Sequence, residues 1–97
     1  MTNKEYVELI DYIKERSTEF ENITVYRVHF TYDPKKDQIS KITLKINYTK
    51  DGSPMPEVIN GKMPKNIVER SENFKGNECT LENIKNWIDD FMKEKGN

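Results

Sequence analysis

The stretch ITVYRVHFTY, residues 23–32, alternates between two kinds of side chain over its whole length. Successive side chains of a β-strand point to opposite faces, and β-branched and aromatic residues favour strands. The stretch therefore predicts a strand with one buried face and one open face. The set expected to be buried is Thr24, Tyr26, Val28, Phe30 and Tyr32. The set expected on the open face begins apolar and turns cationic, and consists of Ile23, Val25, Arg27, His29 and Thr31.

A second alternating stretch, residues 39–49, follows the turn sequence DPKKDQ at 33–38. Asp before Pro favours a type I turn, so the two stretches are predicted to form an antiparallel hairpin. The apolar set of the second strand is Ser40, Ile42, Leu44, Ile46 and Tyr48. The opposite set is Ile39, Lys41, Thr43, Lys45 and Asn47. Because open-face residues of neighbouring strands lie side by side, we expect a cationic patch. Its members are Arg27, His29, Lys41, Thr43 and Lys45.

Two amphipathic helices are predicted outside the hairpin, at about 3–18 and 81–94. Thr2 and Glu5 have the spacing of a capping box, and Thr80 is a good N-cap for the second helix. Apolar residues recur with a helical period in both segments. In the first helix they are Tyr6, Leu9, Ile10 and Ile13. In the second they are Leu81, Ile84, Ile88, Phe91 and Met92, with Trp87 on the flank, and we expect Trp87 and Phe91 in the core.

The segment between the hairpin and the second helix is harder to interpret. Pro54, Pro56 and Pro64 forbid a long central strand, but a short edge strand at about 55–60 is compatible with them. Residues 66–74 are compatible with either a strand or a short helix. The expected order is α-β-β-(β)-(β)-α in a single domain, 1–97. Because each helix must bury its apolar stripe, we predict an α+β fold, a two-layer sandwich. Its small antiparallel sheet of three to four strands would be flanked on one face by the N-terminal and C-terminal helices.

Composition limits the classes of function. The net charge of −1 argues against a general nucleic-acid binder, which usually has a large basic excess. The sequence has no apolar run near the length of a membrane helix and no signal-peptide core, so we expect a cytoplasmic protein without a membrane partner. One cysteine, Cys79, excludes an internal disulfide. Ten Asn, ten Ile, thirteen Lys, three Arg and no Ala are typical of AT-rich codons. This usage indicates a low-GC Gram-positive bacterium or its phage.

The sequence lacks most of the residues that the common catalytic and cofactor motifs require. Structural zinc needs about four Cys or His ligands, and the chain has only Cys79 and His29. A nucleophilic pair of these two is disfavoured, because His29 is expected on the open face, away from the helices. No Gly-rich phosphate-binding motif occurs. We therefore expect no enzyme activity, no metal and no cofactor.

Two surfaces remain as candidates for binding. The first is the cationic patch on the open face, for which the alternative is an ordinary solvated face. The second is the irregular segment 53–64, because methionines adapt to partner surfaces and long loops are often functional. Its apolar residues could equally cap the core, and they are Met55, Val58, Ile59 and Met63.

These surfaces favour a non-enzymatic protein that binds and modulates or inhibits another macromolecule. The expected partner is another protein, and the expected type is a phage or mobile-element inhibitor or a toxin-immunity protein. A nucleic-acid-binding module that uses the cationic sheet face is the alternative, and a small enzyme is third. A homodimer through a bare sheet edge is compatible with each of these.

The expected element order is similar to that of double-stranded RNA-binding domains. Those domains grip phosphates with a lysine cluster at the start of the second helix. The corresponding stretch here, NECTLENIK, carries Glu78 and Glu82 and only one lysine, Lys85. The resemblance is therefore one of element order, and the chain is not assigned to that family.

Overall fold

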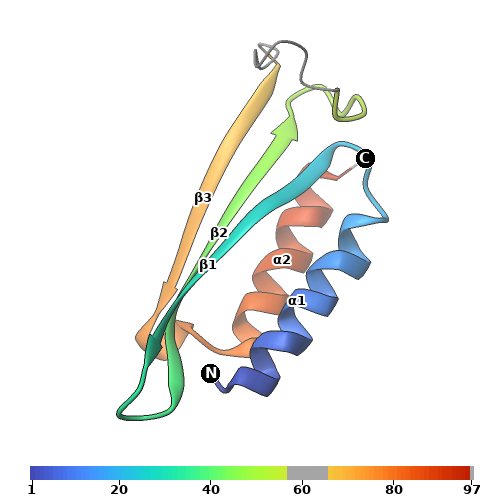
Figure 1. Ribbon diagram of the computed structural model, residues 1–97. Coiled ribbons are helices and arrows are strands. Elements are labelled where there is room, and N and C mark those ends of the chain that lie inside the picture. Colours follow the sequence, from blue (N-terminus) through green and yellow to red (C-terminus); the bar gives the residue numbers. More distant parts are fainter. Residues whose placement is uncertain (57–65, 97) are drawn as a thin grey trace.

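The computed structural model describes residues 1–56 and 66–96 and has an α+β fold. Its three strands form one antiparallel sheet in the order β1-β2-β3, and both helices lie against the same face of it (Figure 1). The elements in chain order are α1 (Asn3–Ser17), β1 (Ile23–Asp33), β2 (Gln38–Thr49), β3 (Ile67–Lys75), a 3-10 turn (Gly76–Glu78) and α2 (Leu81–Lys95). The predicted fold class and element order are confirmed.

Both helices begin at the caps that the sequence predicts. The Thr2 hydroxyl accepts a hydrogen bond from the Glu5 N–H at 3.1 Å, and the Glu5 carboxylate accepts one from the Thr2 N–H at 3.0 Å. The Thr80 hydroxyl accepts from the Asn83 N–H at 3.2 Å. These bonds satisfy N–H groups that have no partner within the helix, and so they fix where each helix starts.

The core lies between the helices and the sheet. Trp87 stacks on Phe91 and meets Phe74 of β3 edge-on. The predicted core placement of Phe91 is confirmed, and Trp87 is partly buried and packs against the core. The two helices are also joined to each other, because Asp89 of α2 accepts from the Tyr12 hydroxyl and pairs with Arg16 at 3.3 Å. The most deeply buried apolar side chains are Leu9, Ile39, Ile42, Leu44, Ile46, Ile84, Ile88 and Met92.

Two irregularities in the β1–β2 pairing change the faces that strict alternation predicts. The register shifts between Val25 and Arg27, so Tyr26 falls in a bulge. A bulge reverses the facing of every residue before it. Ile23 is therefore buried, although it was expected on the open face, and Tyr26 is exposed, although it was expected inside. Phe30 and Tyr32 are also exposed rather than buried, since they lie on an outer strand.

The second shift, between Thr31 and Tyr32, has the same effect on β2. Ile39 was expected on the open face with Lys41, but it is 1 % exposed. The first residue of the chain covers it: the Ile39 N–H donates to the Met1 carbonyl at 2.7 Å, and the Met1 ammonium group donates to the Ile39 carbonyl at 3.1 Å.

The segment 66–74, which the sequence left open, is a strand. β3 pairs with β2 along its whole length, from Thr49 opposite Ile67 to Lys41 opposite Lys75. Met55 and Pro56 are not in a strand, and the rest of the possible short strand at 55–60 lies outside the described residues. Within the parts of the chain that are described, no helix is long and apolar enough to cross a membrane.

Candidate functional site

The open face is the side of the sheet away from the helices, and the strand register defines its members. Arg27 lies opposite Lys45, and His29 lies opposite Thr43, as the sequence predicts. Thr43 in turn lies opposite Asn73 of β3, and its hydroxyl donates to the Asn73 side-chain oxygen at 2.6 Å. The sheet therefore brings the predicted patch together. The open face consists of Thr24, Arg27, His29 and Thr31 on β1, Lys41, Thr43, Lys45 and Asn47 on β2, and Glu69, Ser71, Asn73 and Lys75 on β3.

β3 adds to the open face a fourth side chain that is permanently cationic at neutral pH, and the predicted patch did not include it. Lys75 lies directly opposite Lys41, which itself lies opposite Thr31 of β1. The signal was present as the polar alternation of Glu69, Ser71, Asn73 and Lys75, but it depends on the segment being a strand. The open face thus carries four cations and one carboxylate in a chain whose net charge is −1.

The four cations are Arg27, Lys41, Lys45 and Lys75, and none of them is in an ion pair among the described residues. The cations that are paired lie elsewhere: Arg16 and Lys95 on the helices, and Arg70 on the helix-facing side of β3. Like charges opposite each other on neighbouring strands destabilise a sheet. The charge of this face is therefore not balanced within the part of the molecule that the structure describes.

Replacing Lys75 with glutamate tests whether this repulsion is real. We expect the free energy of unfolding to rise by about 0.5 kcal/mol, because a like-charge cross-strand pair with Lys41 becomes an opposite-charge pair. Urea denaturation at low salt measures the change, and added salt should reduce it. Lys75→Gln is the control and should give a smaller gain. An unchanged or lower stability of Lys75→Glu would show that the two lysines do not interact.

His29 is exposed, and among the described residues it has no partner that would equip it for catalysis. It lines a small hollow of about 160 Å³ with Phe30, Thr31, Lys41 and Thr43. Those neighbours offer hydroxyl groups and a cation but no carboxylate to orient an imidazole. Cys79 lies in the core on the other side of the sheet, where its thiol contacts the Ile39 carbonyl at 3.7 Å. The fold therefore separates the only histidine from the only cysteine.

The start of α2 does not form a basic patch. Glu82 occupies its first turn, and the Lys85 ammonium group lies over the Tyr12 ring, 4.8 Å from the ring centre. This contact holds Lys85 against α1. The lysine is therefore engaged within the fold.

The second predicted surface, 53–64, is described only in part. The Met55 N–H donates to the Glu21 carbonyl at 2.7 Å. The beginning of this segment is therefore hydrogen-bonded to the loop before β1. The Met55 side chain is half-buried. The other three residues predicted for this surface, Val58, Ile59 and Met63, lie outside the described residues.

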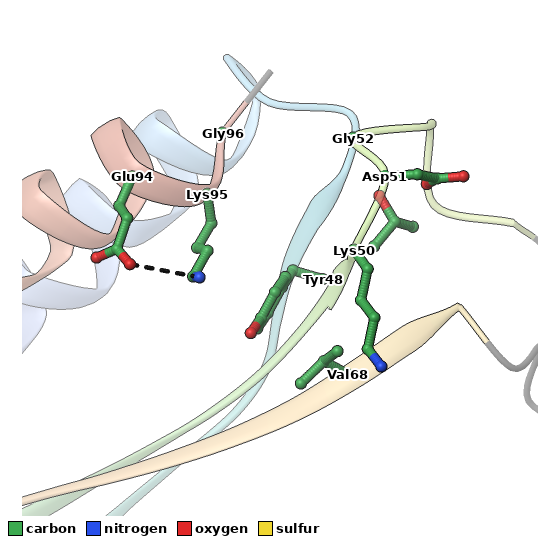
Figure 2. Close-up of a pocket in the computed structure, with 9 residues that line it drawn as sticks. Tyr48, Lys50, Asp51, Gly52, Val68, Glu94, Lys95 and Gly96 are labelled. Atoms are coloured by element: carbon green, nitrogen blue, oxygen red, sulfur yellow. Dashed lines mark ion pairs between the residues drawn. The ribbon is translucent and has the colours of Figure 1, made fainter.

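A hollow of about 520 Å³ lies at the end of α2, between Gly96 and the ends of β2 and β3 (Figure 2). Figure 2 shows the Lys95 side chain beside Glu94 and extending toward the Tyr48 ring. The Lys95 Nζ pairs with the Glu94 Oε1 at 3.3 Å. Asp51 accepts from the Ser53 hydroxyl at 2.7 Å and from its N–H at 3.1 Å, and these bonds lower the pKa of the Asp51 carboxyl. Asp51 is therefore bonded within its own loop, and Glu94 and Lys95 are paired at the helix end.

The arrangement of the open face suits non-covalent contact with a negatively charged surface. The described residues contain no group of three or more His, Cys, Asp or Glu that could hold a metal ion. In comparisons with known proteins, no family model, no curated protein and no solved structure matches this chain.

Proposed function

We propose that this protein is a non-enzymatic binding protein that contacts an acidic surface of another protein with its open face. The observation that carries the proposal is the group of four cations on that face without ion pairs among the described residues. Carboxylates of a partner would relieve the repulsion between Lys41 and Lys75 and would pair with Arg27 and Lys45. Such complementary charge gives specificity and speeds association.

Two features favour a protein partner over a nucleic acid. Proteins that bind single strands stack bases on aromatic side chains, and the described open face carries Thr, Ser and Asn between its charges instead. The chain as a whole is slightly acidic, so its long-range field does not attract a phosphate backbone. A protein surface with a few carboxylates fits the open face better.

Within this proposal, binding inhibits or modulates the partner in the cytoplasm. The protein would be a phage or mobile-element inhibitor, or an immunity protein that blocks a toxin. The support for this step is the combination of a small domain, an absence of recognised catalytic motifs and an AT-rich amino-acid usage.

The proposal is tested by comparing what three tagged proteins retain from the lysate of a low-GC Gram-positive bacterium. They are the wild type, the triple variant Arg27→Glu/Lys41→Glu/Lys45→Glu, and a control in which Lys4, Lys36 and Lys93 become Glu. The control makes the same change in net charge at exposed positions outside the open face. We expect a defined protein to be retained by the wild type and the control and lost with the open-face variant. Circular dichroism and urea denaturation verify that all three are folded.

Other results would reject the proposal in distinguishable ways. A protein retained equally by all three would move the contact away from the open face. Nucleic acid retained by the wild type and lost with the open-face variant would favour the nucleic-acid alternative, and its retention should then fall steeply with salt. If the wild type retains neither a protein nor a nucleic acid, the open face is an ordinary solvated surface.

A further inference from the structure

Within the described residues, no strand pairs with the outer edge of β1. In this part of the chain β1 is an outer strand of the sheet and pairs only with β2 (Figure 1). The Thr31 carbonyl accepts from the Ser40 hydroxyl of β2 at 3.3 Å, so the peptide groups of Thr31 face β2. Because facing alternates along an antiparallel strand, the N–H and C=O groups of Phe30 face outward. The same alternation directs those of Val28 outward.

The other outer strand, β3, is protected against strand addition, whereas β1 is not. β3 carries four charged residues among nine, Glu69, Arg70, Glu72 and Lys75, and charges on an edge discourage pairing with another chain. β1 is longer, with eleven residues, and its strong charges are only Arg27 and Asp33. The sequence therefore leaves β1 as the edge at which pairing is least opposed.

An apolar groove accompanies this edge on the helix side. It has a volume of about 450 Å³, and we call it the α1–β1 groove. Phe30 extends the apolar surface along β1, because its ring packs against the Tyr6 ring with centres 4.9 Å apart and is still 52 % exposed. All of the large apolar side chains that are exposed in the described residues lie on α1 or β1: Val7, Tyr26, Phe30 and Tyr32. The groove is lined by Tyr6, Ile10, Ile13, Lys14, Val25, Tyr26, Arg27 and Val28.

A strand added at this edge would have two different environments for its alternate side chains. Those on the open face would lie beside Arg27 and His29, where carboxylates are favoured. Those on the opposite face would lie beside Val28 and Phe30, along the α1–β1 groove, where apolar side chains are favoured. Strand addition takes its affinity from main-chain hydrogen bonds and its specificity from such alternate positions.

We propose that the free edge of β1 accepts an extended segment of the partner protein, in which acidic residues facing Arg27 alternate with apolar residues facing the α1–β1 groove. The inference rests on the proposed function and specifies the conformation and the side-chain pattern of the partner segment that binds. A second copy of this chain fits less well. Its own β1 would bring another Arg27 and His29 to the same face, where like charges oppose pairing.

The test uses the full chain and synthetic nonapeptides with blocked ends. The probe alternates glutamate and valine, and one control has the same composition in two blocks. Two further peptides carry N-methyl groups on the glutamates only or on the valines only. In any added strand, N–H groups of one set face β1 and those of the other set face solvent. We therefore expect one methylated peptide to bind and the other to fail.

Amide NMR spectra of the labelled protein locate the binding. We expect shifts along β1 and slower hydrogen exchange at the Val28 and Phe30 amides. The non-tolerated methylated peptide should bind at least about tenfold more weakly, as expected from the loss of two or more backbone hydrogen bonds. The block control keeps its N–H groups but cannot place carboxylates on one face and valines on the other, so it should also bind more weakly. A lysine–valine peptide should also bind more weakly, because it would place cations beside Arg27.

Each contrary result rejects the inference. Equal binding of both methylated peptides, or no shifts at about 1 mM probe, would exclude strand addition of this chemistry at β1. Protection of the β1 amides in the protein alone, with a dimeric mass, would assign the edge to a second copy. Shifts confined to Lys45 and Lys75, with loss of binding in the open-face triple variant, would reject the inference but retain the proposed function.

Discussion

Replacing Leu44 with alanine is expected to lower the free energy of unfolding by about 3.5 kcal/mol, the middle of the range for buried leucines. Leu44 is 0 % exposed and lies at the centre of the middle strand, with Val28 on one side and Glu72 on the other. The sheet and the helices both contact this position, so neighbouring side chains have little freedom to close a cavity there. For a domain of this size, such a loss is a large fraction of the total stability.

Urea denaturation measures this effect as a lower midpoint with an unchanged slope. The matched control is Lys45→Ala, the next residue of the same strand, which lies on the open face and should change stability by less than about 0.5 kcal/mol. The contrast between adjacent positions tests the assignment of the two faces. A loss below about 1 kcal/mol at Leu44 would mean that the helices do not pack on this side of the sheet.

The sequence predicts the fold class because its three strongest signals are local. Thr2 with Glu5, Thr80, and the alternation along residues 41–48 each depend on neighbouring residues, and each has the predicted structure. The faces of β1 could not be predicted as well. A bulge at Tyr26 adds one residue to one strand only, and it becomes visible only when the partner strand is placed beside it.

β3 was ambiguous for a different physical reason. Arg70 and Glu72 lie on its helix-facing side, where the alternation rule predicts apolar residues. They are accommodated because they pair with each other at 3.1 Å, and because the Arg70 guanidinium lies over the Trp87 ring at 5.7 Å. These two charged residues break the apolar alternation in the sequence, and the contact with α2 that accommodates one of them is visible only in the structure. The broken alternation also obscured Lys75, the fourth cation of the candidate site.

The thiol of Cys79 should react with Ellman's reagent at least about a hundredfold more slowly in the folded protein than in urea, since an opening free energy of about 3 kcal/mol is required first. Cys79 is 5 % exposed, and burial raises the pKa of its thiol. Folding thus disfavours the thiolate, which is the reactive form. Accordingly, the stability that this group contributes is complete below the ordinary thiol pKa and is lost as the pH rises through the raised value.

The matched control is the double variant Cys79→Ser/Ser71→Cys, which moves the cysteine to the open face. Ser71 is exposed and lies opposite Lys45. This thiol should react near the rate of an unfolded chain. Measuring the reaction of Cys79 in the Leu44→Ala variant then distinguishes two ways in which the thiol can become exposed, global unfolding and local opening. If Cys79 reacts only after global unfolding, the variant should accelerate the reaction by the same factor as it changes the unfolding equilibrium. If the rate is unchanged, the connection between β3 and α2 opens locally. A fast reaction in the unmodified protein would contradict the burial of Cys79 in the core.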